Sequence, residues 1–220
     1  MSTTNLAGSL LDRAKVAKLG KGIHDNVVIT KVDTTERKSN GIPIKKMVYI
    51  TFATIDTVSK KKKHEAEISW WTLDPSSEYF FSNLREYCVQ LNAILGLYMT
   101  EDEAFKAMES TFSEFDFTTA TEMEEYKWKK SEVTTIQDEL ASAFATAIEP
   151  FVGVNSVPFR FKLSTDSKGE NVAFPSYGVF VEPMTVAETK LKFSESELKN
   201  QSKAGNTTAV APASASFKSL

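Results

Sequence analysis

Histidine and cysteine, two residue types that enzymes often use for catalysis or metal binding, number only two and one in this chain and follow no known motif spacing. The pair His64-Glu65 is similar to the start of a zinc-binding helix, but no histidine stands four residues further on, and His24 is the only other histidine. Gly20 and Gly22 are not followed by the Lys-Ser/Thr pair of a phosphate-binding loop. Cys88 lies in an apolar helical stretch, where we expect a buried, unreactive thiol. We therefore predict a non-catalytic protein with no metal site and no cofactor.

A different chemistry is indicated by basic residues that alternate with aromatic ones on predicted strands. Cations neutralise phosphates while flat rings stack on unpaired bases, and each stacked base contributes ~1–3 kcal/mol. Taken singly, each ring is more simply explained as part of the core, and a run of lysines as a solvated turn. The candidate nucleic-acid-binding residues are Lys31, Arg37, Lys38, Lys45, Tyr49, Lys60, Lys61, Lys62, Lys63, Trp70, Trp71, Arg160, Lys162 and Tyr177.

The composition allows a folded domain but not a uniformly basic surface. Of the 220 residues 41% are apolar, which is enough for a substantial core, and the formal net charge is -3. Between residues 21 and 63, basic residues outnumber acids by about 10 to 4, whereas acids predominate by about 13 to 4 between residues 101 and 149. We therefore expect a basic β part and an acidic helical part.

The cysteine content and the hydropathy of the chain indicate the cellular compartment of the protein. With Cys88 as the single cysteine, no intrachain disulfide can form, which is typical of a reducing environment. Residues 1–20 lack a continuous apolar stretch, and nowhere do ~18 apolar residues run together as a membrane-spanning helix requires. The expected location is the cytoplasm.

Alternation of apolar and polar residues predicts strands early in the chain. Residues 23–32 form a short β-type run that ends in a polar loop. Residues 44–55 alternate well, which places Lys46 on the same face as Val48 and opposite Tyr49. Two consecutive strands are therefore expected, joined by a polar and basic connection.

Further strands are predicted on either side of the middle of the chain. Over residues 64–73, Trp70 and Trp71 must point to opposite faces of the pleat, so only one indole can face the core. Residues 157–163 and 172–181 flank a turn and predict a closing hairpin.

Helices are predicted between these strands. Asp74-Pro75 combines a good N-cap with a proline at the first helical position, and the apolar spacing from Phe80 to Tyr98 is helical. Thr100 followed by Glu103 predicts a capping box at the start of a second helix. Apolar residues at 133–148 recur at three- and four-residue steps, so a third helix should end at residue 149, just before a proline.

Strands at both ends with helices between them predict an α+β protein. We expect an OB-like antiparallel β-barrel with a helical insertion and a flexible C-terminal tail. Residues 1–20 form a leader with a possible short helix, residues 21–183 the domain, with the insertion at about 75–149, and residues 184–220 the tail, which is polar and has no periodic core.

The order of these features resembles that of phage-type single-stranded DNA-binding proteins with an OB-like fold. The matching segments span most of residues 20–183: they are GIHDNV at 22–27, VYITF at 48–52, the long helix after the two tryptophans, FRFKL at 159–163, and then Pro175, Tyr177 and FVE at 180–182. The resemblance implies binding of exposed single strands in replication, recombination or repair, without base-specific readout, through a basic groove lined by rings. Such proteins often end in an acidic tail, whereas residues 211–220 here contain Lys218 and no acid.

The expected partner is therefore single-stranded DNA, with the host cytoplasm as the location if a phage encodes the chain. From its charge alone, our hypothesis is that the acidic helical block takes the place of the missing acidic tail as a surface for replication or recombination proteins. An alternative is a structural or packaged virion protein that uses the barrel for protein-protein contacts. An enzyme acting on nucleic acid is disfavoured, because residues for metal or acid-base chemistry do not converge. The oligomeric state stays open.

Overall fold

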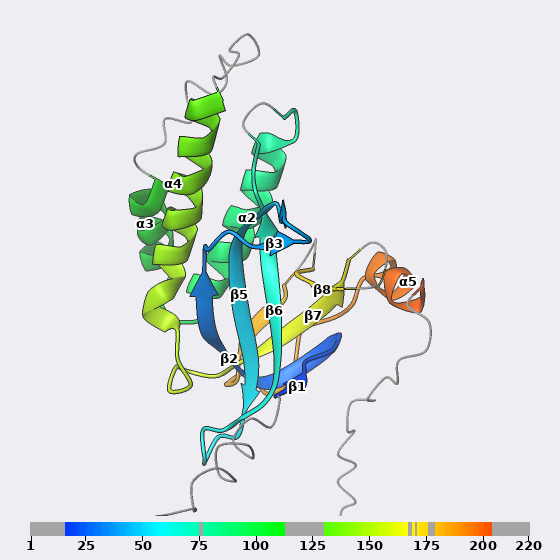
Figure 1. Ribbon diagram of the computed structural model, residues 1–220. Coiled ribbons are helices and arrows are strands. Elements are labelled where there is room, and N and C mark those ends of the chain that lie inside the picture. Colours follow the sequence, from blue (N-terminus) through cyan, green and yellow to red (C-terminus); the bar gives the residue numbers. More distant parts are fainter. Residues whose placement is uncertain are drawn as a thin grey trace, which may run out of the picture.

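A curled, half-barrel sheet forms the centre of the protein, with helices along one side (Figure 1). The structure is a computed structural model that describes residues 16–74, 77–112, 130–166, 169, 171–175 and 179–203. The α+β class predicted from the sequence is confirmed, and the curl of the sheet agrees with a barrel-like fold.

The main sheet is mostly antiparallel and has seven strands. Its neighbours follow the order β1-β6-β5-β2-β7-β8, and β9 also pairs with β7. Among the described strands, β1 alone runs parallel to its partner, β6. The predicted closing hairpin is divided between β8 and β9, which pair with different parts of β7. The strands are β1 (Ala17–Lys18), β2 (Gly22–Asp33), β5 (Lys46–Ile55), β6 (Lys62–Trp71), β7 (Phe159–Thr165), β8 (Val172–Ala173) and β9 (Val181–Pro183).

The helical block lies between β6 and β7 in the chain and packs on one face of the sheet (Figure 1). It contains α2 (Phe80–Leu95), α3 (Glu101–Phe112), α4 (Lys130–Ile148) and the 3-10 turn η2 (Glu149–Phe151). The predicted capping box of α3 is confirmed: the backbone N–H of Thr100 donates to the Glu103 carboxylate at 2.9 Å, and the N–H of Glu103 donates to the Thr100 hydroxyl at 3.4 Å. α4 ends at Ile148, within one residue of the predicted end.

The start of α2 differs from the prediction. The helix begins at Phe80 and not at Asp74-Pro75, because the Asp74 carbonyl accepts a turn hydrogen bond from Ser77 N–H at 2.9 Å. Phe80, the first residue of α2, is buried in the core. α2 ends at Leu95, which leaves Tyr98 in the turn that follows.

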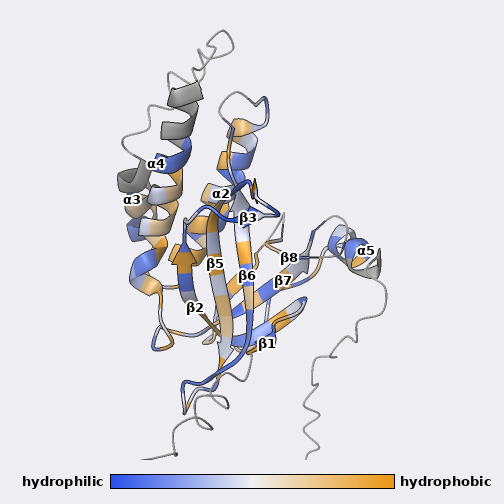
Figure 2. Ribbon diagram, in the orientation of Figure 1, coloured by the Kyte–Doolittle hydropathy of each residue, from blue (hydrophilic) through white to orange (hydrophobic). Residues whose placement is uncertain are grey.

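Trp70 joins the two layers of the core. Its ring lies 5.6 Å from that of Tyr87 on α2, 4.9 Å from that of Phe144 on α4 and 5.6 Å from that of Phe174 beyond β8. Its indole N–H donates to Gln90 Oε1 at 2.6 Å, so the one polar atom of the ring is satisfied. Figure 2 shows apolar residues along α2 and α4, which cover this core, and hydrophilic residues in the β5–β6 loop. Trp70 thus takes the core-facing position of the tryptophan pair.

A β-bulge in β5 places Lys46 on the face opposite to the predicted one. Lys46 pairs with Trp71 while Val48 pairs with Trp70, so Met47 is the extra residue in the ladder. Met47 and Val48 are both buried in the core, and Lys46 lies with Trp71 on the other face. The expectation that Lys46 shares a face with Val48 was wrong, because strict alternation does not anticipate an inserted residue.

Residues 184–203 differ from the flexible tail that the sequence predicts. Leu191 is buried, and α5 (Glu195–Lys203) packs on β7 through a contact between Glu197 and Lys162. Figure 1 shows α5 beside β7 and β8. Residues 204–220 of the predicted tail and residues 1–15 of the predicted leader lie outside the described residues.

Candidate nucleic-acid interface

The face of β2, β5 and β6 that points away from the helices holds three of the candidate residues, Lys31, Tyr49 and Trp71. We call it the outer face. Register pairs Lys46 with Trp71, Tyr49 with Ser69, and Thr51 with Glu67 across β5 and β6, and it pairs Lys31 with Thr51 and Asp33 with Tyr49 across β2 and β5. Because side chains alternate along a strand, these residues share one surface.

An exposed indole with an ammonium group against it lies at one end of this face. Trp71 is 59% exposed, and Lys46 Nζ lies 3.2 Å from the centre of the indole ring. We call these residues the Trp71/Lys46 pair. The backbone beneath it is fixed, because Trp71 N–H donates to the hydroxyl of Tyr87 at 3.1 Å and Thr72 N–H donates to the Lys45 carbonyl at 3.3 Å. A cation over an aromatic face is attractive, so the pair is a preformed element of the surface.

The environment of Lys46 changes its acidity. Partial burial lowers the pKa of Lys46 to about 8, and the negative charge of Asp166 only partly offsets this effect. Lys46 therefore loses its charge at a lower pH than an ordinary lysine. Sequence reasoning did not include Lys46 among the candidates, because alternation placed it in the core.

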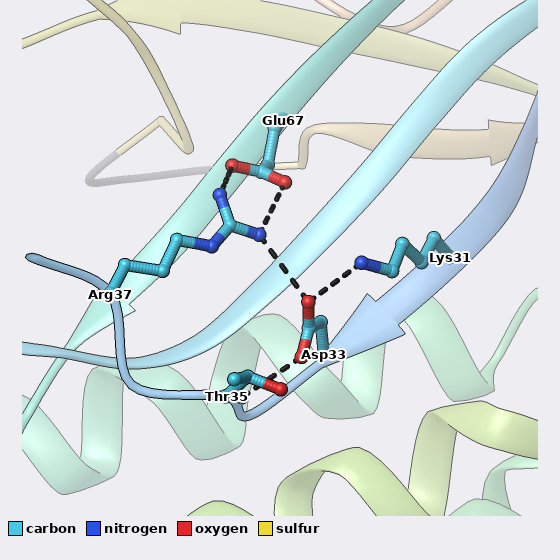
Figure 3. Close-up of polar contacts among 5 residues, drawn as sticks. All are labelled: Lys31, Asp33, Thr35, Arg37 and Glu67. Atoms are coloured by element: carbon cyan, nitrogen blue, oxygen red, sulfur yellow. Dashed lines mark hydrogen bonds and ion pairs between the residues drawn. The ribbon is translucent and has the colours of Figure 1, made fainter.

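A network of ion pairs crosses the middle of the outer face (Figure 3). Arg37 binds both carboxylate oxygens of Glu67, with Nη2 at 2.9 Å from Oε2, and approaches Asp33 at 3.5 Å. Lys31 Nζ lies 2.6 Å from Asp33, whose second oxygen accepts the Thr35 N–H at 2.9 Å. These contacts hold the pKa of Asp33 well below its usual range. The charges of Lys31 and Arg37 are therefore largely matched by carboxylates.

Tyr49 lies beneath this network. The guanidinium carbon of Arg37 is 3.7 Å from the centre of the Tyr49 ring, and Tyr49 is only 5% exposed. Burial raises the pKa of the Tyr49 hydroxyl. The structure thus places Tyr49 on the predicted face but under a cover.

The lysine run, Lys60 to Lys63, occupies the opposite end of β5 from the Trp71/Lys46 pair, at the end of the β5–β6 loop and the start of β6 (Figure 1). Asp56 organises the loop by accepting the N–H groups of Val58 and Ser59 at 3.1 and 2.9 Å. Two lysines of the run are paired, Lys63 with Asp56 at 3.2 Å and Lys62 with Glu65 at 3.5 Å. Lys60 and Lys61 have no ion pair within the described part of the chain. The ten residues of β5, at ~3.3 Å each, separate this loop from the Trp71/Lys46 pair. The basic connections at the two ends of β5 therefore do not form one surface.

Arg160 and Lys162 on β7 are structural, contrary to the expectation that they face solvent. Arg160 Nε lies 2.6 Å from Asp25, and its Nη1 pairs with Glu182. Lys162 is 2% exposed and donates to the Lys192 carbonyl at 2.9 Å. Their partners are far away in the sequence, which is why alternation alone assigned both residues to an open groove.

The remaining candidate residues are either buried, exposed in a connection between strands, or outside the described residues. Trp70 is buried in the core and has no surface for a ligand. Lys38 and Lys45 are exposed in the β2–β5 connection, where β3 (Lys38–Ser39) and β4 (Ile42–Pro43) form a small hairpin near the Trp71 end. Tyr177 lies outside the described residues.

Comparison of the chain with protein-family models, with curated proteins and with solved structures gave no match. In the parts of the chain that the structure describes, no group of three or more His, Cys, Asp and Glu residues is placed to hold a metal ion. Nor is any helix there both long enough and apolar enough to span a bilayer.

Proposed function

We propose that this chain binds single-stranded DNA on the outer face of the sheet, at the end that carries the Trp71/Lys46 pair. The observation that carries the proposal is an indole exposed on a rigid strand with an ammonium group 3.2 Å from its ring centre. Such a pair offers a base a stacking surface and its phosphate a cation at the same point. Lys38 and Lys45 in the adjacent connection add positive charge on one side.

The strand connectivity supports an OB-like fold for this proposal. β2, β5 and β6 form a meander, the helical block follows, and β7 then returns to pair with β2. In OB-folds, oligonucleotides bind the face of the second and third strands and the loop between the first and second. With β2 as the first strand, these are β5, β6 and residues 34–45. The Trp71/Lys46 pair and the two exposed lysines fall within that region.

The biological role we propose is protection or organisation of exposed strands in replication, recombination or repair, in the host cytoplasm, as for the phage-type proteins that the sequence resembles. α3 starts with three exposed acids, Glu101, Asp102 and Glu103. They support a contact between the helical block and replication or recombination proteins. Deletion of residues 101–130 without loss of any partner in pull-downs would contradict that part of the proposal.

The proposed function predicts fluorescence quenching by single strands. Stacking of a base on Trp71 should quench tryptophan emission when oligo-dT is added at low salt. Affinity should fall steeply as salt rises, since bound phosphates release counterions. A titration at several salt concentrations measures both effects, with duplex DNA of the same length as the control. No quenching and no binding at the lowest salt would exclude the proposal.

Lys46 gives the proposed binding a pH dependence. With a pKa of about 8 in the free protein, Lys46 is protonated at neutral pH and loses its charge above pH 8. A bound phosphate favours the ammonium form, so affinity should be constant below about pH 7 and fall as pH rises through 8 to 9. Lys46→Arg keeps its charge throughout this range and should remove the dependence. Binding isotherms of both proteins between pH 6.5 and 9.5 measure it, and identical pH profiles would contradict a role for Lys46.

A further inference from the structure

The side chain of Arg37 covers the ring of Tyr49. Its ring lies on the outer face, in register with Ser69 of β6 and Asp33 of β2, where the helical layer does not reach. The only described group stacked on the ring is the guanidinium of Arg37, 3.7 Å from the ring centre. Arg37 comes from the connection between β2 and β3, outside any strand. Displacement of one side chain would therefore expose an aromatic ring next to the proposed interface.

The contacts that hold Arg37 in place are of a kind that exchanges readily. The side chains of Arg37 and Glu67 are 33% and 36% exposed, and the pair lies at the surface. Surface ion pairs are screened by water and contribute little to stability. A phosphate can bind the guanidinium fork in the same bidentate manner as a carboxylate. A polyanion on the outer face thus competes directly with Glu67 for Arg37.

The Tyr49 hydroxyl is a second, independent observation. It is buried and has no hydrogen-bond partner among the residues that the structure describes. Buried polar groups are nearly always paired, so an orphaned hydroxyl indicates that another arrangement, open to solvent or a ligand, satisfies it better. A phenylalanine ring would fill the same place without burying an unpaired hydroxyl.

We propose that Tyr49 is a second base-stacking position, covered by Arg37 in the free protein and uncovered when a phosphate replaces Glu67 as the partner of Arg37. This inference rests on the proposed function. Its ligand is a nucleotide of the same single strand: the base stacks on Tyr49 and the phosphate binds Arg37.

The position of Tyr49 suits a strand that also reaches Trp71. Tyr49 pairs with Ser69, two residues before Trp71 on β6, so the two rings are diagonal neighbours on the face. Diagonal neighbours in an antiparallel pair are ~7–8 Å apart. Two bases of one single strand can therefore occupy the two rings without a gap in the contact surface.

Two carboxylates on one strand and one face provide a matched test. Glu67→Gln removes the competitor for Arg37, whereas Glu65→Gln removes an equal charge that pairs with Lys62. For oligo-dT we expect Glu67→Gln to bind roughly two- to fivefold more tightly than Glu65→Gln, as the loss of a surface ion pair allows. Equal affinities of the two variants would overturn the inference.

Tyr49→Leu and Tyr49→Phe separate the ring from the hydroxyl. Leucine should weaken binding by roughly five- to hundredfold, the effect of one lost stacked base, and phenylalanine should leave it unchanged. In the Tyr49→Leu background, the gain from Glu67→Gln should disappear, because that gain acts through the uncovered ring. Should Tyr49→Leu fail to fold, the comparison of Glu67→Gln with Glu65→Gln still tests the inference.

The outcomes distinguish this inference from the function on which it rests. If Trp71→Leu weakens binding while Tyr49→Leu binds as the wild type, only the second stacking position is excluded. If the wild type binds no oligo-dT at low salt, the proposed function itself is excluded.

Discussion

Replacement of Trp71 by leucine should lower the affinity for oligo-dT by roughly five- to hundredfold, the range expected when one base loses its stacking partner. On the outer face the indole of Trp71 is 59% exposed and the ring of Tyr49 only 5%, so of these two described rings only Trp71 is open to a base until Tyr49 is uncovered. The same substitution should abolish the part of the quenching that comes from Trp71, to which Trp70 cannot contribute because it is buried in the core; the third tryptophan, Trp128, lies outside the described residues. Equilibrium titrations followed by anisotropy of a labelled oligonucleotide measure the affinity independently of tryptophan.

Phe105→Leu is the matched control. Phe105 on α3 is 61% exposed, nearly the same as the 59% of Trp71, but it lies on the helical block. Loss of an exposed ring there should leave affinity unchanged, and urea unfolding should show both variants as stable as the wild type to within about 0.5 kcal/mol. Equal effects of the two substitutions would place the binding surface elsewhere.

The parts of the fold that depend on local sequence were predictable. The long strands appear within a few residues of their expected bounds, because alternation reports which residues face a core. The capping box at Thr100 and Glu103 follows from side-chain hydrogen bonds within one turn. The opposite facing of Trp70 and Trp71 follows from the pleat alone, although the sequence did not decide which of the two is buried.

The connection between β2 and β5 contains a local turn signal. Asn40-Gly41 is a strong sequence pattern for a two-residue hairpin, and both residues have positive φ, 51° and 79°, as a type I′ turn requires. The hairpin of β3 and β4 forms around it, in a stretch that the polar composition predicts to be a loop. It matters for the candidate site because it positions Lys38 beside the outer face.

The charge partners of the candidate residues could not be predicted. Arg37 meets Glu67, and Arg160 meets Asp25 and Glu182, at separations of 30, 135 and 22 residues. A linear count of charges shows an excess of lysine and arginine but not which of them are neutralised by tertiary contacts. The candidate surface consequently shrinks from a broad groove to one end of β5 and β6.

The contacts of the C-terminal segment with β7 were not predictable from the sequence either, and we expect their loss to lower the stability of the fold strongly. Ser194 and Glu197 form a capping box at the start of α5: the N–H of Ser194 donates to Glu197 at 2.6 Å, and the N–H of Glu197 donates to the Ser194 hydroxyl at 3.3 Å. The polar composition hid this signal. Glu197 also lies 3.2 Å from the ammonium group of Lys162, whose side chain is 2% exposed.

Replacement of Glu197 by leucine should therefore lower the free energy of unfolding by about 3–5 kcal/mol, because it leaves the charge of Lys162 buried without a counter-charge. A urea titration followed by circular dichroism measures the change. Glu195→Leu, an exposed residue of the same first turn, is the control and should change the free energy by no more than about 0.5 kcal/mol.

The double variant Lys162→Met/Glu197→Leu tests the cause of the loss. It removes both charges and keeps apolar volume between β7 and α5, so it should recover most of the stability that Glu197→Leu loses, apart from ~1 kcal/mol for the missing cap. If Glu197→Leu were as stable as Glu195→Leu, the ammonium group of Lys162 would have to reach water in solution. Residues 184–203 would then be separable from β7, and Lys162 would again be available to a polyanion.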